Sequence, residues 1–186
     1  MKNIALKTVF EDLCVFILAL SLGLSSVGLK KPEKNTPAPS SSQEAYFSPN
    51  GHIKGRIIDE IANAKDSIDI AVFNITSLGI KTALKKTQKR GVPIRILSDQ
   101  GQSEDLHSVM GSLLEDGFKI KLIEGKGQNG LMHNKFAIFD HKLLLTGSYN
   151  WTETAEHYNY ENVLFLRDKN LIKAYQNEFD LLWSKN

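Results

Sequence analysis

The sequence predicts a single α/β domain in which strands and helices alternate. Short apolar runs of strand length interleave with segments whose apolar residues recur at helical spacing, and a chain of 186 residues suits one hydrophobic core. With 41% apolar and 24% charged residues, the chain is neither disordered throughout nor a polytopic membrane protein. Its one cysteine, Cys14, excludes an intramolecular disulfide framework and a multi-cysteine zinc site. The formal net charge of +2 is small, so an anion-binding surface requires local clustering of basic residues.

The N-terminal 29 residues differ from the rest of the chain. Positions 13–29 form a run of 17 residues without a charge, with lysines on both sides. As a helix this run would be about 25 Å long, slightly short of the roughly 30 Å hydrocarbon core of a bilayer. A retained membrane anchor and a cleaved signal peptide both remain open, while the absence of a polar stripe disfavours a helix buried in the core. The flanking lysines nearly balance and leave the orientation in a membrane undecided.

Residues 30–44 have the composition of an extended, solvated tether. They hold three of the five prolines and no large apolar residue, so they cannot bury a core. The folded domain is therefore expected to comprise residues 45–186.

The first half of this domain shows four elements. A helix over 51–65 carries isoleucines on one face, and the apolar run 67–74 has the length of a strand. A second helix over 78–90 has a lysine-rich face and is ended by the glycine and proline of 91–93, after which 94–97 forms a short strand.

The second half adds two helices and four strands. A helix over 104–115 is closed by Gly117, and a last helix begins after Asp168, which can cap it. The four strands are short apolar runs at 119–123, 136–139, 143–146 and 163–166. Catalytic groups of such a fold are expected on loops at strand ends.

The segment 131–161 holds residue types that suit chemistry on a phosphate group. His133 and Lys135 are two positions apart, so in an extended chain they project to the same side. Lysine neutralises negative charge, the carboxamide of Asn150 can donate to non-bridging oxygens, and a neutral imidazole can attack phosphorus or move a proton. A carboxylate such as Glu161 can keep the other imidazole nitrogen protonated and fix the orientation of the ring. Each residue alone would be an ordinary surface or turn residue, and the remaining histidines lack a spacing typical of metal ligands.

Together these residues belong to a longer pattern. The segment HNKFAIFDHKLLLTGSYN fits H-x-K-x4-D-x6-G-S-x-N at every specified position, which adds Asp140, Gly147 and Ser148. This pattern resembles the signature of the phospholipase D superfamily. Residues 45–183 as a whole are similar to its small bacterial endonucleases, the Nuc type, also in YFSP at 46–49, in AVFN at 71–74 and in the position of Glu161. The chain lacks the cysteine and histidine insertion of the related mitochondrial cardiolipin hydrolase and piRNA nuclease, which favours the bacterial branch.

The resemblance implies a phospholipase D-like fold, a mixed β-sheet flanked by helices on both faces. It also implies a metal-independent phosphodiesterase that needs no cofactor. In this family a histidine matching His133 attacks the phosphodiester to give a covalent phosphohistidine, and a second histidine protonates the departing oxygen and then activates water. The chain carries one copy of the motif, so the resemblance implies a homodimer that places His133, Lys135 and Asn150 of both subunits around one phosphate.

The resemblance gives three further residues supporting roles. Ser148 is expected to assist by hydrogen bonding and Glu161 to orient an imidazole. Asp140 is expected to brace the loops rather than to transfer a proton.

The motif serves nucleic acids and phospholipids alike, so other residues have to indicate the substrate. Lys81, Lys85 and Lys86 are expected to lie near backbone phosphates, with a solvated helix face as the alternative. Tyr149 and Trp151 are expected to stack on unpaired bases, with core packing or dimer contacts as the alternative. DNA or RNA is therefore the expected substrate. A membrane phospholipid such as cardiolipin is the first alternative, and an inactive membrane-tethered nucleic-acid binder is the second.

These expectations together suggest a location. The domain is expected to face the bacterial periplasm, either held at the inner membrane by the apolar run 13–29 or secreted after its cleavage.

Overall fold

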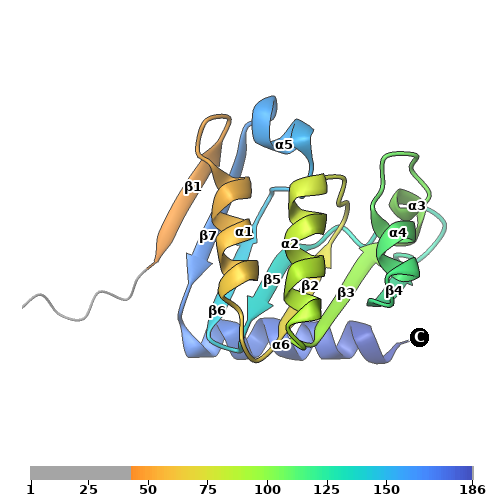
Figure 1. Ribbon diagram of the computed structural model, residues 1–186. Helices are drawn as coiled ribbons and strands as arrows, with labels where there is room; N and C mark the ends of the chain where they lie inside the picture. Colours follow the sequence, from red (N-terminus) through yellow and green to blue (C-terminus); the bar gives the residue numbers. More distant parts are fainter. Residues whose placement is uncertain (1–42, 186) are drawn as a thin grey trace, which may run out of the picture. The chain divides into compact units, whose positions relative to one another are not determined.

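The computed structural model describes residues 43–185, which form a seven-stranded mixed sheet with helices on both faces (Figure 1). The strand order is β1-β7-β6-β5-β2-β3-β4, with β2, β3 and β4 parallel and all other neighbours antiparallel. The strands are β1 (Glu44–Ser48), β2 (Ile68–Val72), β3 (Ile94–Asp99), β4 (Lys119–Ile123), β5 (Lys135–Phe139), β6 (Leu143–Gly147) and β7 (Glu161–Leu166). This is the architecture that the sequence predicts.

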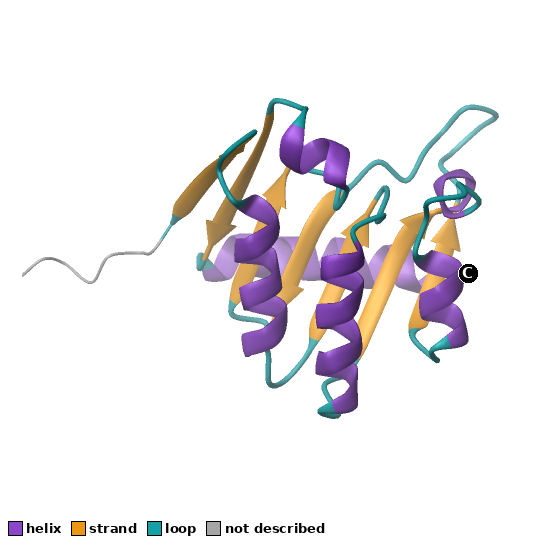
Figure 2. Ribbon diagram, turned by 45° about the horizontal axis from the view of Figure 1, so that its top comes forward, coloured by secondary structure: helices purple, strands orange, loops and turns teal. Residues whose placement is uncertain are grey.

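The helices cover the two faces of the sheet unequally. Helices α1 (Ile53–Asn63), α2 (Leu78–Lys89) and α4 (Met110–Glu115) lie on one face, and α6 (Lys169–Ser184) crosses the other (Figure 2). Two short helices, α3 (Gln100–Ser103) and α5 (Glu153–His157), lie at the upper edge of the sheet in Figure 1.

Each face of the sheet has its own apolar cluster. In β2, Ile68, Ile70 and Val72 pack toward α1 and α2, whereas Ala71 joins the cluster beneath α6. This alternation is the period of two expected for a strand, and burial on both faces explains why β2 reads as a nearly continuous apolar run.

Helix α6 is held to the sheet by a polar contact as well as by packing. The buried carboxylate of Asp69 accepts two hydrogen bonds of 2.7 Å from Arg95, and the guanidinium of Arg95 lies 4.7 Å from the ring centroid of Phe179 on α6. As predicted, Asp168 caps this helix through hydrogen bonds from the N–H groups of Asn170 and Leu171.

One predicted helix is correct only in its second half. Of the expected helix over 104–115, Met110–Glu115 is helical as α4, whereas the chain from 104 to 109 turns. The Asp105 carboxylate accepts the N–H of His107 at 2.7 Å, a local bond that competes with helical hydrogen bonding. Leu106 is 92% exposed, so no apolar burial favours continuing the helix there.

Three short elements were not predicted, and one predicted segment cannot be placed. Strand β1 and helix α5 have five residues each and helix α3 has four, too few to show a clear hydrophobic period. The apolar run 13–29 lies outside the described residues. Within residues 43–185, none of the helices has the length and apolar character needed to cross a membrane.

Candidate active site

One edge of the sheet gathers the motif residues other than Asp140. Register places Val72, at the end of β2, opposite Lys135, at the start of β5, and it places Gly147, at the end of β6, opposite Val163 near the start of β7. The ends of β1, β2, β3, β4 and β6 therefore share an edge with the beginnings of β5 and β7. The carboxyl ends of parallel strands are where α/β sheets usually build their sites.

Phe73 joins the two central motif residues. The ring centroids of Phe73 and His133 are 4.6 Å apart in an edge-to-face arrangement, and the Lys135 ammonium lies 4.9 Å from the Phe73 centroid. His133 is exposed and Lys135 is buried. Both side chains thus lie on the same side of the chain, as their spacing predicts.

The Lys135 ammonium is held in place but incompletely balanced. Its Nζ donates a hydrogen bond of 2.7 Å to the backbone carbonyl of His133. Burial lowers the pKa of Lys135 to about 8, although the negative charge of Glu161 acts in the opposite direction. A buried cation of this kind has a strong preference for an incoming anion.

Ser148 and Glu161 form a second cluster at the same edge. The Ser148 hydroxyl donates to Glu161 Oε2 and accepts the N–H of Asn162 at 3.1 Å. The other Glu161 oxygen accepts from Asn159 Nδ2 at 2.9 Å. The Glu161 carboxylate is therefore engaged by Ser148 and Asn159, whereas the His133 ring makes no hydrogen bond within residues 43–185.

Gly147 allows β6 and β7 to approach closely beside this cluster. A Cβ added at Gly147 would lie 2.1 Å from the backbone oxygen of Asn162. The glycine of the motif is thus required by sterics, because any side chain would push apart the strands that carry Ser148 and Glu161.

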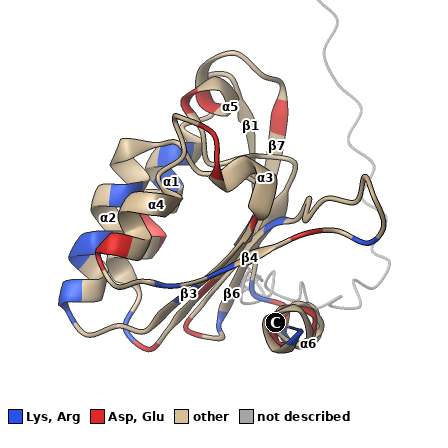
Figure 3. Ribbon diagram, turned by 90° about the vertical axis from the view of Figure 1, so that its right-hand side faces the viewer, with Lys and Arg blue, Asp and Glu red and all other residues tan. Residues whose placement is uncertain are grey.

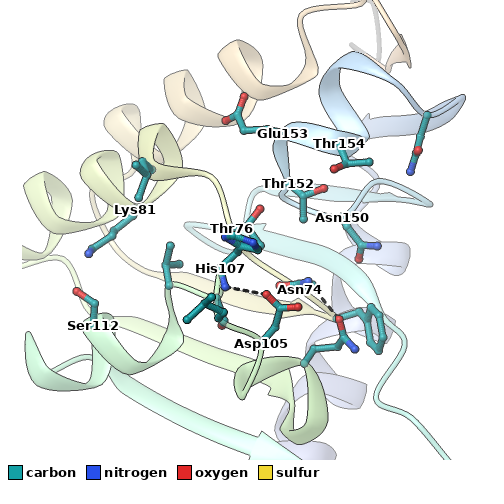
Figure 4. Close-up of a pocket in the computed structure, with 17 residues that line it drawn as sticks. Asn74, Thr76, Lys81, Asp105, His107, Ser112, Asn150, Thr152, Glu153 and Thr154 are labelled. Atoms are coloured by element: carbon teal, nitrogen blue, oxygen red, sulfur yellow. Dashed lines mark hydrogen bonds between the residues drawn. The ribbon is translucent and has the colours of Figure 1, made fainter.

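Asn150 connects the motif to a neighbouring cleft of about 770 Å³ (Figure 4). The cleft lies between the end of β2, the start of α2, the loop between α3 and α4, and the loop that follows β6. Its wall includes Phe73, Asn74 and Asn150, but not His133, Lys135, Ser148 or Glu161. The amide oxygens of Asn74 and Asn150 are buried and have no hydrogen-bond partner in the part of the chain that the structure describes.

The prediction that Tyr149 and Trp151 stack on bases is wrong. Tyr149 is 1% and Trp151 is 0% exposed, so neither ring is available to a ligand. The Tyr149 hydroxyl donates to Glu156 Oε2 at 2.8 Å, and burial together with this carboxylate raises the Tyr149 pKa. The backbone of Trp151 bonds to the segment that follows β2, accepting from the N–H groups of Thr76 and Ser77. Both residues fix the loop that presents Ser148 and Asn150.

Asp140 lies at the opposite edge of the sheet. Its carboxylate accepts the N–H groups of Lys65, Asp66 and Ser67 at 2.7–3.1 Å. These hydrogen bonds lower the pKa of Asp140 against the effect of burial, which raises it. Its contacts are those of a bracing residue that joins the β5–β6 turn to the start of β2.

The three lysines predicted to bind phosphate have different surroundings. Lys81, near the start of α2, lines the cleft. Lys85 forms a 2.8 Å ion pair with Asp116. Lys86 is exposed and, like Lys85, is not part of the cleft wall. Figure 3 shows the basic residues spread along α2, so Lys81 is the one of the three that borders the site.

Phe73 and Asn74 are site residues that the sequence reasoning did not identify. Both follow β2 directly, so the rule that sites form where parallel strands end could have found them. Within residues 43–185, no group of three or more His, Cys, Asp or Glu side chains comes together as metal ligands would.

The fold and the motif identify a class of enzyme, and comparisons with known proteins agree. The family model described as "Cardiolipin synthase, PLD-like domain" matches residues 57–183. The chain therefore belongs to this phospholipase D-like family, and it is a phosphodiesterase of the hydrolase class.

Curated relatives share about a third of their residues with the chain. It is 35% identical over 156 residues to the mitochondrial cardiolipin hydrolase of Chlamydomonas reinhardtii, covering 83% of this chain and 69% of the relative. It is 32% identical over 154 residues to the protein of the same name from Xenopus laevis, with the same two coverages.

Two solved bacterial structures match the whole fold. NucT from Helicobacter pylori superposes with a TM-score of 0.68 at 27% identity, covering 76% of this chain and 96% of NucT. Nuc from Salmonella typhimurium, a phospholipase D family member, gives a TM-score of 0.69 at 26% identity, covering 77% of this chain and 95% of Nuc.

Proposed function

We propose that the protein hydrolyses the phosphodiester backbone of DNA or RNA through a phosphohistidine at His133, in a site completed by a second copy of the chain. The observation that carries this proposal is the packing of His133 and Lys135 on Phe73 at the edge that also presents Ser148, Asn150 and Glu161. An exposed imidazole next to a buried cation suits nucleophilic attack on an anionic phosphorus.

The first step forms a bond between an imidazole nitrogen of His133 and phosphorus and breaks one phosphorus–oxygen bond. Lys135 balances the charge on the non-bridging oxygens, and the carboxamide of Asn150 donates to them. In the second step water attacks phosphorus, and the His133–phosphorus bond breaks.

A second histidine is needed to protonate the departing oxygen and to take a proton from water. Four other histidines lie within the described residues, and none of them hydrogen-bonds to Lys135, Ser148 or Glu161. His107 lines the neighbouring cleft, His157 on α5 pairs with Glu153, His52 precedes α1, and His141 is near the opposite edge. His133 of a second copy fits this role in a two-fold symmetric dimer, where the same patch of both subunits meets. Glu161 of one copy then has the charge to hold a protonated imidazole of the other.

Hydrolysis of a membrane phospholipid is the second candidate function. Curated relatives at 30–35% identity carry the name mitochondrial cardiolipin hydrolase. Leu78, Leu106 and Leu131 are 56–92% exposed on segments at the same edge, and an apolar rim of this kind suits contact with lipid. The polar lining of the cleft and the exposed rings of Tyr158 and Tyr160 favour nucleic acid.

A substrate panel tests this proposal. Residues 43–185 would be incubated with single-stranded DNA, duplex DNA, RNA and cardiolipin vesicles, each with and without EDTA. We expect His133-dependent cleavage of nucleic acid that persists in EDTA. Lipid hydrolysis without nucleic-acid cleavage would reverse the order of the two candidates, and loss of activity in EDTA that a divalent cation restores would contradict the mechanism.

We further propose that the chain is held at the inner membrane, with the domain in the periplasm. The apolar run 13–29 supports this location. Two experiments on cells that express the full chain test this location. Fractionation should recover the chain with the inner membrane, and protease added to intact spheroplasts should digest the domain. A domain that resists the protease would contradict a periplasmic position.

A further inference from the structure

The cleft beside Asn150 has no role in the chemistry described above. Its volume of about 770 Å³ is larger than one phosphate group requires and lies within the range of ligand sites, roughly 300–1,000 Å³. Figure 4 shows side chains from separate segments around it, among them Asn74, Lys81, His107 and Asn150. The cleft therefore has room for a part of the substrate that extends away from the reacting phosphate.

Among the described residues, Lys81 is the one lysine or arginine in the cleft wall. The wall also holds two carboxylates, but each has a partner: Asp105 accepts the N–H of His107, and Glu153 pairs with Lys54 and accepts from Ser77. Within residues 43–185, Lys81 forms neither an ion pair nor a side-chain hydrogen bond, whereas its neighbour one turn along, Lys85, is paired with Asp116. An unpaired ammonium at the wall of a cleft, away from His133, suits a second phosphate of the same substrate.

Two carboxamide oxygens in the cleft wall lack a hydrogen-bond partner within residues 43–185. Asn74 donates to Gln102 Oε1 at 3.2 Å, but its amide oxygen and that of Asn150 are buried and unpaired. Unpaired buried acceptors are unfavourable, so both side chains gain by turning toward a donor in the cleft. Base edges of an unpaired strand carry N–H donors, and in a duplex these edges are occupied by pairing.

We propose that this cleft binds the nucleotide next to the scissile phosphate in a single strand, with Lys81 on its phosphate and the Asn74 carboxamide on its base. This inference rests on the proposed nuclease function and adds a subsite and a strand preference to it. The enzyme is then a nuclease that acts on unpaired nucleic acid.

Affinity measured against salt tests the phosphate contact. In a His133→Ala background, which prevents cleavage, fluorescence anisotropy with a 12-nucleotide single strand would be recorded for Lys81→Gln. Loss of one phosphate contact should lower the slope of log affinity against log salt by about 0.7. Lys89→Gln, at an exposed position in the last turn of the same helix, is the matched control and should keep the original slope. Equal slopes for Lys81→Gln and its parent would overturn the inference.

Abasic substitution tests the base contact. A single abasic residue would be placed at successive positions from the cleavage site, and the original protein should lose affinity at one position next to it. Asn74→Ala should remove that position dependence, and a protein that shows no position dependence would contradict the base contact.

Three further measurements separate this inference from the proposed function. If the protein hydrolyses bis(p-nitrophenyl) phosphate but no nucleic acid, the proposed function fails; if it cleaves single strands and Lys81→Gln behaves as wild type, only the inference fails. On single-stranded substrate, Lys81→Gln should raise KM more than on the small diester. Sedimentation of Lys81→Gln shows whether the variant keeps the oligomeric state of the wild type. Conversion to a monomer would assign Lys81 to the subunit contact and overturn its assignment to the cleft.

Discussion

The hydroxyl of Tyr149 donates a hydrogen bond of 2.8 Å to the buried carboxylate of Glu156. The same carboxylate oxygen accepts the N–H of Lys54 in the first turn of α1 at 3.0 Å. The residue between Ser148 and Asn150 is thereby tied both to α5 and to α1.

Tyr149→Phe should therefore weaken both the fold and the site. We expect the free energy of unfolding to fall by about 1–3 kcal/mol, because the buried Glu156 carboxylate loses a partner. We expect kcat to fall more than KM, because Ser148 and Asn150 lose their fixed position. Urea denaturation and steady-state kinetics check this, with Tyr158→Phe as the exposed control; equal behaviour of the two variants would contradict the positioning role.

His133→Ala should abolish turnover without unfolding the protein. Removal of a nucleophile lowers kcat by at least about a thousandfold, whereas an exposed side chain contributes about 0.5 kcal/mol or less to stability. His141→Asn is a suitable control, because His141 is exposed near the opposite edge and asparagine tolerates its positive φ of 52°. Substantial residual activity in His133→Ala would exclude it as the nucleophile.

The affinity for an anionic substrate should decrease as the pH rises through about 8. Lys135 has a pKa of about 8 because it is buried, so above this pH it becomes neutral and no longer attracts phosphate. The measurement is the pH dependence of the inhibition constant of inorganic phosphate. Affinity would be expressed for the phosphate dianion, because inorganic phosphate itself titrates near pH 7. A constant affinity for the dianion between pH 7 and 9.5 would contradict this role of Lys135.

Glu161→Gln gives a second test of how the pKa of Lys135 controls phosphate affinity. The negative charge of Glu161 raises the pKa of Lys135 against the effect of burial. Its removal should therefore shift the alkaline limb of the affinity profile to lower pH. A shift to higher pH, or no shift, would show that the two charges do not interact as described.

Lys135→Met should stabilise the fold at pH 7 while it destroys phosphate binding. The pKa of Lys135 is lower in the folded state than its ordinary value of 10.5, so the charged form is unfavourable in the fold, fully so below about pH 8. As the pH rises from 8 to 10.5, the folded protein releases the proton first, and the stability of the wild type should approach that of the variant. Chemical denaturation at pH 7 and pH 10 checks this, and a variant less stable than wild type at pH 7 would contradict the burial penalty.

Much of this site could be predicted from the sequence because the relevant features depend on residues close together in the chain. The spacing of His133 and Lys135 sets their common side wherever the chain is extended, and their contacts with Phe73 confirm it. The capping role of Asp168 depends on its immediate neighbours alone and was predicted correctly.

The errors concern tertiary contacts. Tyr149 and Trp151 flank exposed motif residues, yet they are buried because the loop packs against α1 and the segment after β2. The cleft is assembled from segments more than 75 residues apart, such as Asn74 and Asn150, so no spacing reveals it. The turn at Asp105 replaces the first part of the predicted helix. It depends on a local hydrogen bond and on the exposure of Leu106, and neither can be read from the hydrophobic pattern.

Trapping of the covalent intermediate tests the central claim most directly. The protein would be mixed with single-stranded DNA, quenched within milliseconds at alkaline pH, where phosphohistidine is stable, and digested for mass spectrometry. The mechanism predicts a nucleotide adduct on the peptide that contains His133, located on the imidazole and absent from His133→Ala. An adduct on another residue, or rapid turnover with no adduct at any time point, would contradict it.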